Sequence, residues 1–310
     1  MRFLSNTNYD FVGKRKMALV LSLVAIAVGI ASLVTHGGPR YSIDFTGGSL
    51  IQVQFPQATT VEEVREALNA SGVANAEIQR FGAPDEILIR IQRTGDTDAM
   101  EDVKAALQSR WPDYTNRREE TVGPKIGGEL RSAAGQAIFL ALFLILIYIT
   151  IRFEFRFAVA AIMALVHDVL ITLGAFSLAN HEVSLAVIAA FLTIVGYSLN
   201  DTIVVFDRIR ENLRVPGREP YDQILNRSVN QSLSRTVITS GTTIVVVVVL
   251  LIFGGEVLRD FAFALTVGVV VGTYSSVFVA TPILVEWEKR RPRRTKTGTP
   301  RGKQKAAVAS

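Results

Sequence analysis

The stretch AAGQAIFLALFLILIYITI, residues 133–151, contains no charged side chain. A helix of this length rises about 1.5 Å per residue and therefore crosses the roughly 30 Å of a bilayer's hydrocarbon layer. The chain contains six apolar blocks of similar length. In a soluble protein, six such helices would leave too few polar faces in contact with water. The sequence therefore predicts a polytopic α-helical membrane protein with six transmembrane helices: 17–35, 133–151, 157–178, 183–206, 237–253 and 261–285.

The overall composition restricts the function classes. The chain has 310 residues, of which 49% are hydrophobic, with 33 Lys and Arg against 28 Asp and Glu and no cysteine. Without cysteine there can be no disulfide and no thiolate metal site. The basic residues stand beside the apolar blocks, where membrane topology explains them, so no nucleic-acid partner is expected. The first block is longer than the apolar core of a secretory signal and reads as a retained anchor.

Positive charges indicate how the chain is oriented. Most Lys and Arg residues fall in segments 1–16, 152–156, 207–236 and 286–310, whereas the short segments 179–182 and 254–260 contain only Arg259. Cytoplasmic connections are the ones enriched in Lys and Arg. We therefore expect both termini in the cytoplasm, with residues 1–16 as a cytoplasmic N-terminus, and residues 36–132 on the opposite, periplasmic side.

Residues 36–132 have the pattern of a small soluble domain. Ser49–Phe55 alternates apolar and polar residues, as a strand does, and Thr60 with Glu63 has the spacing of a helix capping box. Further strands are expected at 76–81, 87–91 and 116–122, and helices at 61–70 and 98–110. The order βαββαβ predicts an α+β, ferredoxin-like extracytoplasmic domain between helices 1 and 2.

Two other segments lie outside the spans. Within the bundle of residues 133–288, apolar residues recur at helical spacing in 221–235, which predicts a cytoplasmic amphipathic helix on the inner membrane face. The tail 289–310 is basic and poor in apolar residues, so we expect it to be disordered or bound to lipid headgroups. Contact of the tail with RNA or the ribosome is the alternative.

Common enzyme motifs are absent from the sequence. It contains no P-loop, no dinucleotide fingerprint in a strand–helix context and no HExxH pair of histidines. We therefore expect no enzymatic activity, no metal and no cofactor. An ion gradient is then the usual energy source for a membrane machine, with protons as the coupling ion.

Charged residues inside a span cost about 2.5–3.5 kcal/mol or more and call for a reason. Asp201 lies with Asn200 in the inner third of the fourth block, and Arg235 precedes the fifth block on the same side. This placement predicts a titrating carboxylate with a cationic partner, used for proton coupling. The alternatives are an Asp201 that reaches the interface or caps a neighbour, and an Arg235 that only sets topology.

A second polar group lies midway along the third block. His167 and Asp168 are consecutive and therefore point about 100° apart on a helix, so they cannot both face one partner squarely. They are candidates for a secondary relay, and Tyr197, Ser198 and Thr202 could add hydroxyl groups near Asp201. Alternatively, Asp168 bonds to a neighbouring helix and the hydroxyl residues only pack.

Small residues cluster in the last two blocks. Gly268 and Gly272 are four positions apart, a spacing that allows close approach of two helices. The candidate packing residues, within the bundle or against a second subunit, are Gly241, Gly268, Gly272, Ser275 and Ser276.

Six strings match a known family. They are DFTGG (Asp44, Phe45, Thr46, Gly47, Gly48), VGPKIGGEL at 122–130, HDVLITLG at 167–174, VGYSLNDTIVVFDRIREN at 195–212, RTVITSGTT at 235–243 and GTYSS at 272–276. Through them the chain resembles the SecD/SecF family of protein-export membrane proteins, of the RND (resistance-nodulation-division) superfamily. Among its members it is similar to the smaller chains that pair with SecD, from about residue 9 to 287.

The resemblance implies half of an RND arrangement that pairs with a SecD chain in the bacterial inner membrane. It implies work beside the SecYEG translocon, where the proton motive force promotes late steps of the passage of an unfolded preprotein. The family's transmembrane Asp and Arg correspond to Asp201 and Arg235. The sequence leaves two alternatives open: half of an RND exporter of lipids or drugs, and a passive assembly factor of the translocase.

Overall fold

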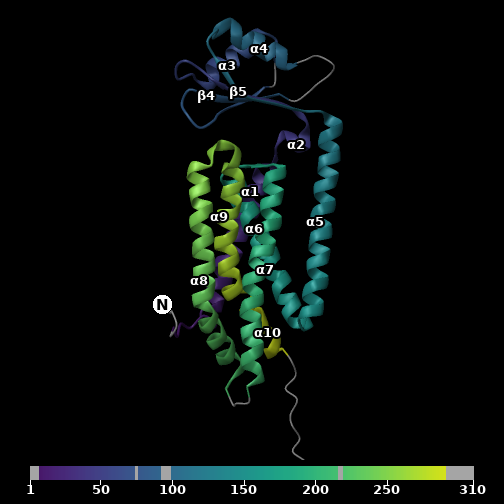
Figure 1. The fold of residues 1–310 in the computed structure, drawn as a ribbon, viewed down its shortest axis with the longest axis vertical. Helices are drawn as coiled ribbons and strands as arrows, with labels where there is room; N and C mark the ends of the chain where they lie inside the picture. Colours follow the sequence, from purple (N-terminus) through teal and green to yellow (C-terminus); the bar gives the residue numbers. More distant parts are fainter. Residues whose placement is uncertain (1–6, 74–75, 92–98, 216–218, 291–310) are drawn as a thin grey trace, which may run out of the picture.

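Within the described part of the chain, six helical segments are long and apolar enough to cross a membrane, as the sequence predicts (Figure 1). The structure is a computed structural model that describes residues 7–73, 76–91, 99–215 and 219–290. The segments are α1 (Arg15–Thr35), α5 (Pro124–Arg152), α6 (Phe155–Leu178), α7 (Leu185–Arg214), α8 (Tyr221–Phe253) and a sixth made of α9 (Gly255–Ser275), the π-helical turn η1 (Ser276–Ala280) and α10 (Thr281–Lys289).

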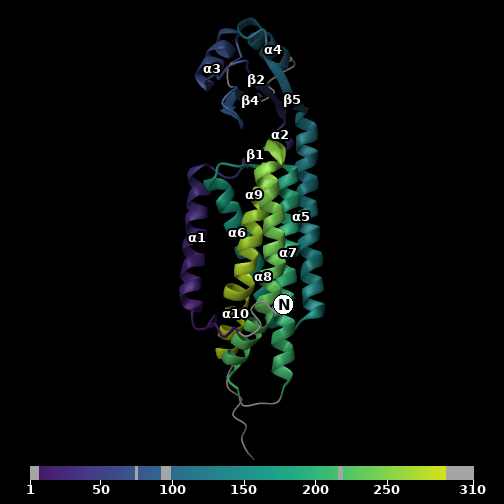
Figure 2. The same ribbon diagram turned by 60° about the vertical axis from the view of Figure 1, so that its left-hand side comes forward.

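The bundle has a buried centre and an exposed periphery. The apolar windows of α6, α7 and the sixth segment are 44–56% buried, whereas that of α5 is 6% buried. Figures 1 and 2 show α5 standing along one side of the bundle, and Figure 2 shows α1 along another. Side chains such as Phe139 and Leu144 of α5 are exposed and apolar, which suits contact with lipid.

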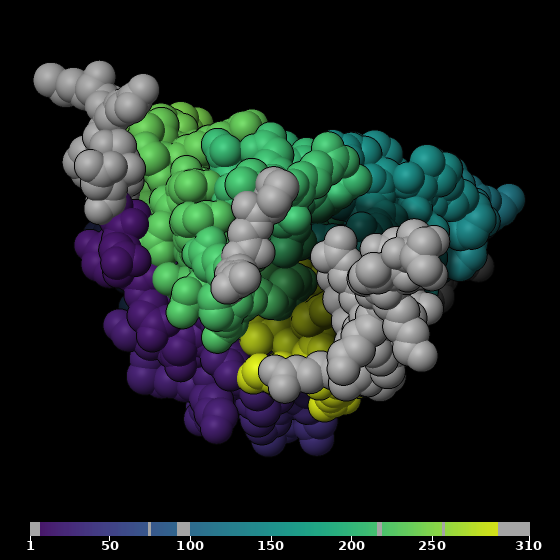
Figure 3. Space-filling view, turned by 90° about the horizontal axis from the view of Figure 1, so that it is seen from below, coloured from purple at the N-terminus to yellow at the C-terminus, as the bar shows by residue number. Residues whose placement is uncertain are grey.

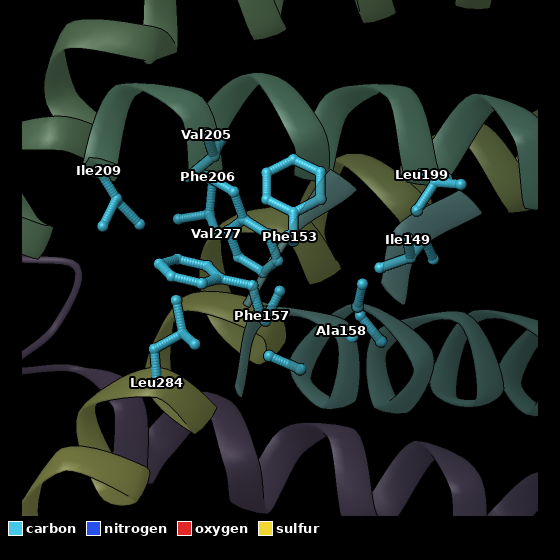
Figure 4. Close-up of a cluster of buried hydrophobic side chains, with 14 of the residues drawn as sticks. Ile149, Phe153, Phe157, Ala158, Leu199, Val205, Phe206, Ile209, Val277 and Leu284 are labelled. Atoms are coloured by element: carbon cyan, nitrogen blue, oxygen red, sulfur yellow. The ribbon is translucent and has the colours of Figure 1, made fainter. Parts of the chain in front are cut away.

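Aromatic side chains pack together near the turn between α5 and α6, at the end of the bundle away from the α+β domain (Figures 1 and 4). Phe153, Phe157 and Phe206 pack edge to face or tilted, with ring centroids 5.1–6.2 Å apart. Leu284 of α10 lies against this cluster. A view of the same end shows the purple N-terminal segment and teal α5 on separate sides of α7, α8 and α10 (Figure 3). The cluster thus fixes the α5–α6 turn against α7 and α10.

The α+β domain has the element order that the sequence predicts. β2 (Gly48–Gln54), α3 (Val61–Ala70), β3 (Glu77–Arg80), β4 (Glu86–Ile91), α4 (Ala99–Arg110) and β5 (Thr115–Val122) follow one another. The sheet is antiparallel with the order β3-β4-β2-β5. This is the ferredoxin-like βαββαβ topology. Residue 98, with which we expect the second helix to begin, lies outside the described residues.

Alternating strand residues form the core of this domain. Ile51, Val53 and Ile89 of the sheet are fully buried against Leu68 of α3 and Leu107 of α4. This is the outcome of period-two alternation on strands facing helices. The capping box is also present, with Thr60 and Glu63 each accepting a hydrogen bond from the other's backbone N–H.

The segment 221–235 is helical, but it is not a separate helix on the membrane surface. It is the first part of α8, which runs unbroken into the span because nothing between Tyr221 and Ser240 is a helix breaker. Its apolar residues Leu225 and Val229 are buried in the main bundle cluster rather than turned to lipid. Asn226 and Asn230 hold the backbone of Tyr9 on its polar side.

Candidate functional site

Asp201 lies inside the bundle, held by two hydroxyl groups from other helical elements. Its side chain belongs to α7 and is 8% exposed. Thr236 of α8 donates from Oγ1 to Asp201 Oδ1 at 2.6 Å, and Ser276 of η1 donates from Oγ to Oδ2 at 2.5 Å. Both carboxylate oxygens are thus satisfied by neutral donors. The group joins three elements of the bundle at one point.

Arg235 is not in direct contact with Asp201. Among the described residues no hydrogen bond or ion pair joins them, although the arginine charge acts on the carboxylate through space. The Arg235 side chain is exposed, and its neighbour Thr236 makes the contact instead. Consecutive helix residues point about 100° apart, so only one of the two can face α7. The direct Asp201–Arg235 pair expected from the sequence is therefore absent within this chain.

Asp168 forms a second buried acid site on α6. Its side chain is 1% exposed and accepts from Ser198 Oγ of α7 at 2.5 Å and from Ser275 Oγ of α9 at 2.8 Å. His167 Nδ1 lies 2.9 Å from its other oxygen. The side chains of His167 and Asp168 are therefore in contact, because the imidazole ring turns back toward one carboxylate oxygen while the other oxygen faces α7 and α9.

His167 continues this network to α1. Its Nε2 lies 3.0 Å from Ser22 Oγ, and Ser22 Oγ lies 3.1 Å from the Tyr274 hydroxyl. Tyr274 donates to the backbone oxygen of Ala18 at 2.8 Å. The roles of Ser22 and Tyr274 were not predictable from the sequence, since a single hydroxyl residue in an apolar span is usually a packing residue.

Two consecutive serines connect the acid sites. Ser275 ends α9 and bonds Asp168, and Ser276 begins the π-helical turn and bonds Asp201. We expected both as packing residues, but each also donates to an acid. Wider π-turns occur often at functional sites. A shift of this turn would change the surroundings of both carboxylates at once.

The other hydroxyl and amide candidates differ in placement. Tyr197 donates to Ser240 Oγ at 3.3 Å, and Ser240 also receives a hydrogen bond from Thr273. Thr202 is buried, whereas Asn200 is exposed. Tyr197 therefore belongs to a separate α7–α8–α9 contact rather than to the bonds of Asp201.

Glycines bring the central helices close. A Cβ at Gly268 would lie 2.4 Å from Ile194, and one at Gly272 would lie 2.9 Å from Ser198, so both face α7 tightly. A Cβ at Gly241 would meet nothing within 4 Å in the described part of this chain. A further glycine pair, which the sequence does not reveal, meets backbone to backbone: Cβ atoms at Gly29 and Gly174 would lie within 2.8 Å of each other's backbone, where α1 crosses α6.

The DFTGG segment joins the α+β domain to the bundle. Its first three residues lie in α2 (Ile43–Thr46), and Asp44 Oδ2 accepts from the Leu185 backbone N–H at 2.9 Å, at the first residue of α7. Arg131 of α5 donates to the Phe45 carbonyl at 2.7 Å. Gly47 has a φ of 72° and passes so near Pro124 that a Cβ would lie 3.1 Å from it. The motif thus connects the α+β domain to α5 and α7.

Ion pairs attach the domain sheet to the loop between α6 and α7. Arg90 of β4 pairs with Glu182 of β6 (Glu182–Val183), which forms a two-stranded parallel sheet with β1 (Arg40–Tyr41). Arg40 pairs with Glu77 of β3, and Arg40 Nη2 lies 3.6 Å from Glu182. The Arg90 side chain is only 10% exposed. This ion-pair cluster is a second attachment of the domain to the bundle.

The fold and the site together define a class: a multi-pass membrane protein with a ferredoxin-like domain between helices 1 and 2 and hydroxyl-bound acids in its core. Residues 102–290 match the family described as protein export membrane protein SecD/SecF, C-terminal, and residues 32–58 match the SecD/SecF GG motif. The chain belongs to this family, among its SecF protein translocase subunits.

Individual relatives agree with this assignment. Protein translocase subunit SecF of Desulfurispirillum indicum is 49% identical and covers 90% of this chain and 92% of its own length. The SecF of Vibrio alginolyticus is 46% identical, with 89% of each chain covered. The crystal structure of SecDF, a translocon-associated membrane protein from Thermus thermophilus, has a TM-score of 0.85 at 41% identity over 93% of this chain. This chain spans 40% of the length of that structure.

Proposed function

We propose that this chain pairs with a SecD chain and uses the proton motive force to promote late steps of preprotein translocation beside SecYEG. The solved relative that combines SecD and SecF, and carries the description translocon-associated, supports the partner. The observation that carries the proposal is Asp201, a carboxylate inside the bundle that is bonded by hydroxyl groups of two other elements. Protein export by the relatives favours this reading over a lipid or drug exporter.

Protonation would change the bonding of Asp201. As a carboxylate it accepts from Thr236 and Ser276, and as an acid it becomes a donor itself. The through-space attraction to the Arg235 charge is lost at the same moment. One proton yields about 2.3 kcal/mol per 100 mV of potential and about 1.4 kcal/mol per pH unit. This is enough to shift a near-balanced helix arrangement by tens-fold.

The route from the acid to the domain runs along α7. Asp44 receives the first backbone N–H of this helix, so a displacement of α7 would reach the domain through α2. In the proposed orientation both termini are cytoplasmic and the domain is periplasmic, as the distribution of Lys and Arg favours. The unfolded preprotein and the membrane lipids are the remaining proposed partners, and no substrate-binding residue is assigned.

The test is gradient-stimulated export from inner-membrane vesicles that carry Asp201→Asn. We expect the stimulation to be lost while ATP-driven export without a gradient is kept. Asp207→Asn is the matched control, because Asp207 lies on the same helix but at its exposed end, paired with Arg152. Normal stimulation with Asp201→Asn would leave only the passive assembly role.

A further inference from the structure

The His167–Asp168 pair has no part in the proposed action of Asp201. Both side chains are buried, at 5% and 1% exposure, in the middle of α6. They begin a series of four consecutive contacts: Asp168 to His167, His167 to Ser22, Ser22 to Tyr274, and Tyr274 to the backbone oxygen of Ala18. The last three contacts attach α1 to α6 and α9.

If all four contacts are hydrogen bonds, the number of protons determines the protonation state of this pair. Four contacts need four protons, and the Ser22 and Tyr274 hydroxyls provide one each. The His167–Asp168 pair must therefore carry two. Either a doubly protonated imidazole faces a carboxylate, or a neutral imidazole faces a carboxylic acid. Both forms have a net charge of zero, which suits the low dielectric of the bundle, and in both the His167 Nε2–H donates to Ser22.

Loss of one proton leaves one contact without a hydrogen. The neutral imidazole then donates from Nδ1 to the Asp168 carboxylate, and its bare Nε2 accepts from Ser22. The Ser22 hydroxyl can no longer donate to Tyr274. If Tyr274 turns its own hydrogen to Ser22, the bond to Ala18 is lost instead. In either case one hydrogen bond between α1 and α9 is missing. If Ser22 instead keeps donating to Tyr274, the hydrogen bond between His167 of α6 and Ser22 of α1 is missing.

We propose that His167 and Asp168 form a second proton-binding site, distinct from Asp201, whose proton closes a hydrogen-bonded clamp on α1. The site takes a proton and no larger ligand, because its neighbours fill the space with direct contacts. α1 leads at Thr35 toward β1 and the α+β domain. Release of the clamp therefore removes one attachment of the first of the two helices that flank the domain, while the Gly29–Gly174 crossing with α6 remains.

The groups around the site define what else could titrate. α1 contributes only Ser22 and the Ala18 carbonyl to these contacts, and α9 contributes Ser275 and the titratable Tyr274. From α7, Ser198 donates to Asp168. Two further charged residues are linked to this network: Asp201, through Ser276 next to Ser275, and Arg235 of α8, whose charge acts on Asp201. The pH response of α1 must therefore be tested with Asp201 removed.

The first measurement is the protonation of His167 Nε2 in the full chain in lipid nanodiscs. The sequence has three histidines, so nitrogen-15 histidine spectra can be assigned by single substitutions. We expect Nε2 to carry hydrogen at low pH and to lose it in one step as the pH rises. The ratio of the two forms should change about tenfold per pH unit. An Nε2 that stays bare at every pH would overturn the proposal.

The second measurement is the position of α1. The chain has no cysteine, so spin labels at Leu21→Cys on α1 and Val270→Cys on α9 report one distance. We expect a narrow distance distribution below the His167 midpoint and a broad one above it. Asp168→Asn should keep it narrow at all pH values, because the amide donates to Nδ1 and leaves hydrogen on Nε2. Ser22→Ala should keep it broad while Nε2 still titrates.

One control separates this inference from the proposed function. In Asp201→Asn the pH step of α1 should persist, even though gradient-stimulated export is lost. If the step disappears with Asp201→Asn, the clamp belongs to the Asp201 site and the second site is wrong. If α1 shows no pH step in the unsubstituted chain, or keeps one in Asp168→Asn, the proposal fails whatever export does.

Discussion

At the scale of single residues, the hydrogen bond from the Thr236 hydroxyl shows that Asp201 is held in place by another helix and does not merely lie within a span. The sequence pairs Asp201 with Arg235, yet the direct contact comes from the next residue along α8. A one-letter sequence cannot tell which of two neighbours faces α7, because this depends on the rotation of α8. The identity of the acid was predictable from the cost of burying charge, and the identity of its donors was not.

Thr236→Val should lower gradient-stimulated export several-fold. Valine keeps the shape of threonine but leaves Asp201 Oδ1 without its donor, and an unsatisfied buried acceptor costs about 1–3 kcal/mol. Thr242→Val is the control, since Thr242 is exposed and bonds only carbonyl groups of its own helix. Vesicle export with and without a gradient makes the comparison. Equal stimulation in both variants would contradict a role for this hydrogen bond.

At the scale of elements, the crossing of α1 and α6 depends on two glycines. Gly29→Ala should lower the stability of the protein in detergent by about 1–3 kcal/mol, because the new methyl group would meet the backbone of Gly174. Gly241→Ala should have almost no effect on this chain alone. Thermal unfolding of each variant in the same detergent is the measurement. A Gly29→Ala midpoint equal to that of Gly241→Ala would argue against tight crossing.

The attachment of α4 to β5 should weaken in acid. A hydrogen bond from Lys104 lowers the pKa of Glu119 below its usual value of 4.5, and Glu119 raises the pKa of Lys104 in return. A lowered carboxyl pKa stabilises the fold above pH 4.5, and this contribution is lost as the pH falls through the lowered value. Because the pair is partly exposed, it is worth at most about 1 kcal/mol.

Glu119→Gln should therefore speed hydrogen exchange of the β5 amides at pH 7, and the effect should be smaller near pH 3. Exchange followed by mass spectrometry on the full chain measures both conditions. An effect of the same size at both values would mean that the glutamate acts through packing rather than through its charge.

Elements themselves were largely predictable. Long apolar runs predict the six spans, and period-two alternation with a capping box predicts the βαββαβ order. The π-helical turn was not predictable, because the sequence from Ser276 to Ala280 has no local sign that separates it from an α-helix. The continuity of α8 was missed for a related reason: an amphipathic face looks the same whether protein or lipid covers it.

At the scale of the whole molecule, the ion-pair cluster holds the domain over the bundle. Glu182→Gln should broaden the range of domain positions, because it leaves the Arg90 guanidinium, which is 10% exposed, without its closest carboxylate. Spin-label distances between the domain and α5 measure this. Glu62→Gln is the control, since Glu62 forms only an exposed pair with Arg65 on α3. An unchanged distribution would show that α2 alone carries the domain.

One consequence follows from the bond between Asp44 and the first residue of α7. The helix is 30 residues long without a proline, about 45 Å, and Asp201 lies about 24 Å along it. The helix therefore fixes both the distance of Asp201 from the domain and the direction in which its side chain points. Inserting one residue between Leu185 and Asp201 would turn the acid by about 100° away from its donors, whereas seven would nearly restore the angle but misplace it by about 10 Å. The coupling of Asp201 to the α+β domain should therefore tolerate substitutions along α7 far better than any change in the length of that helix.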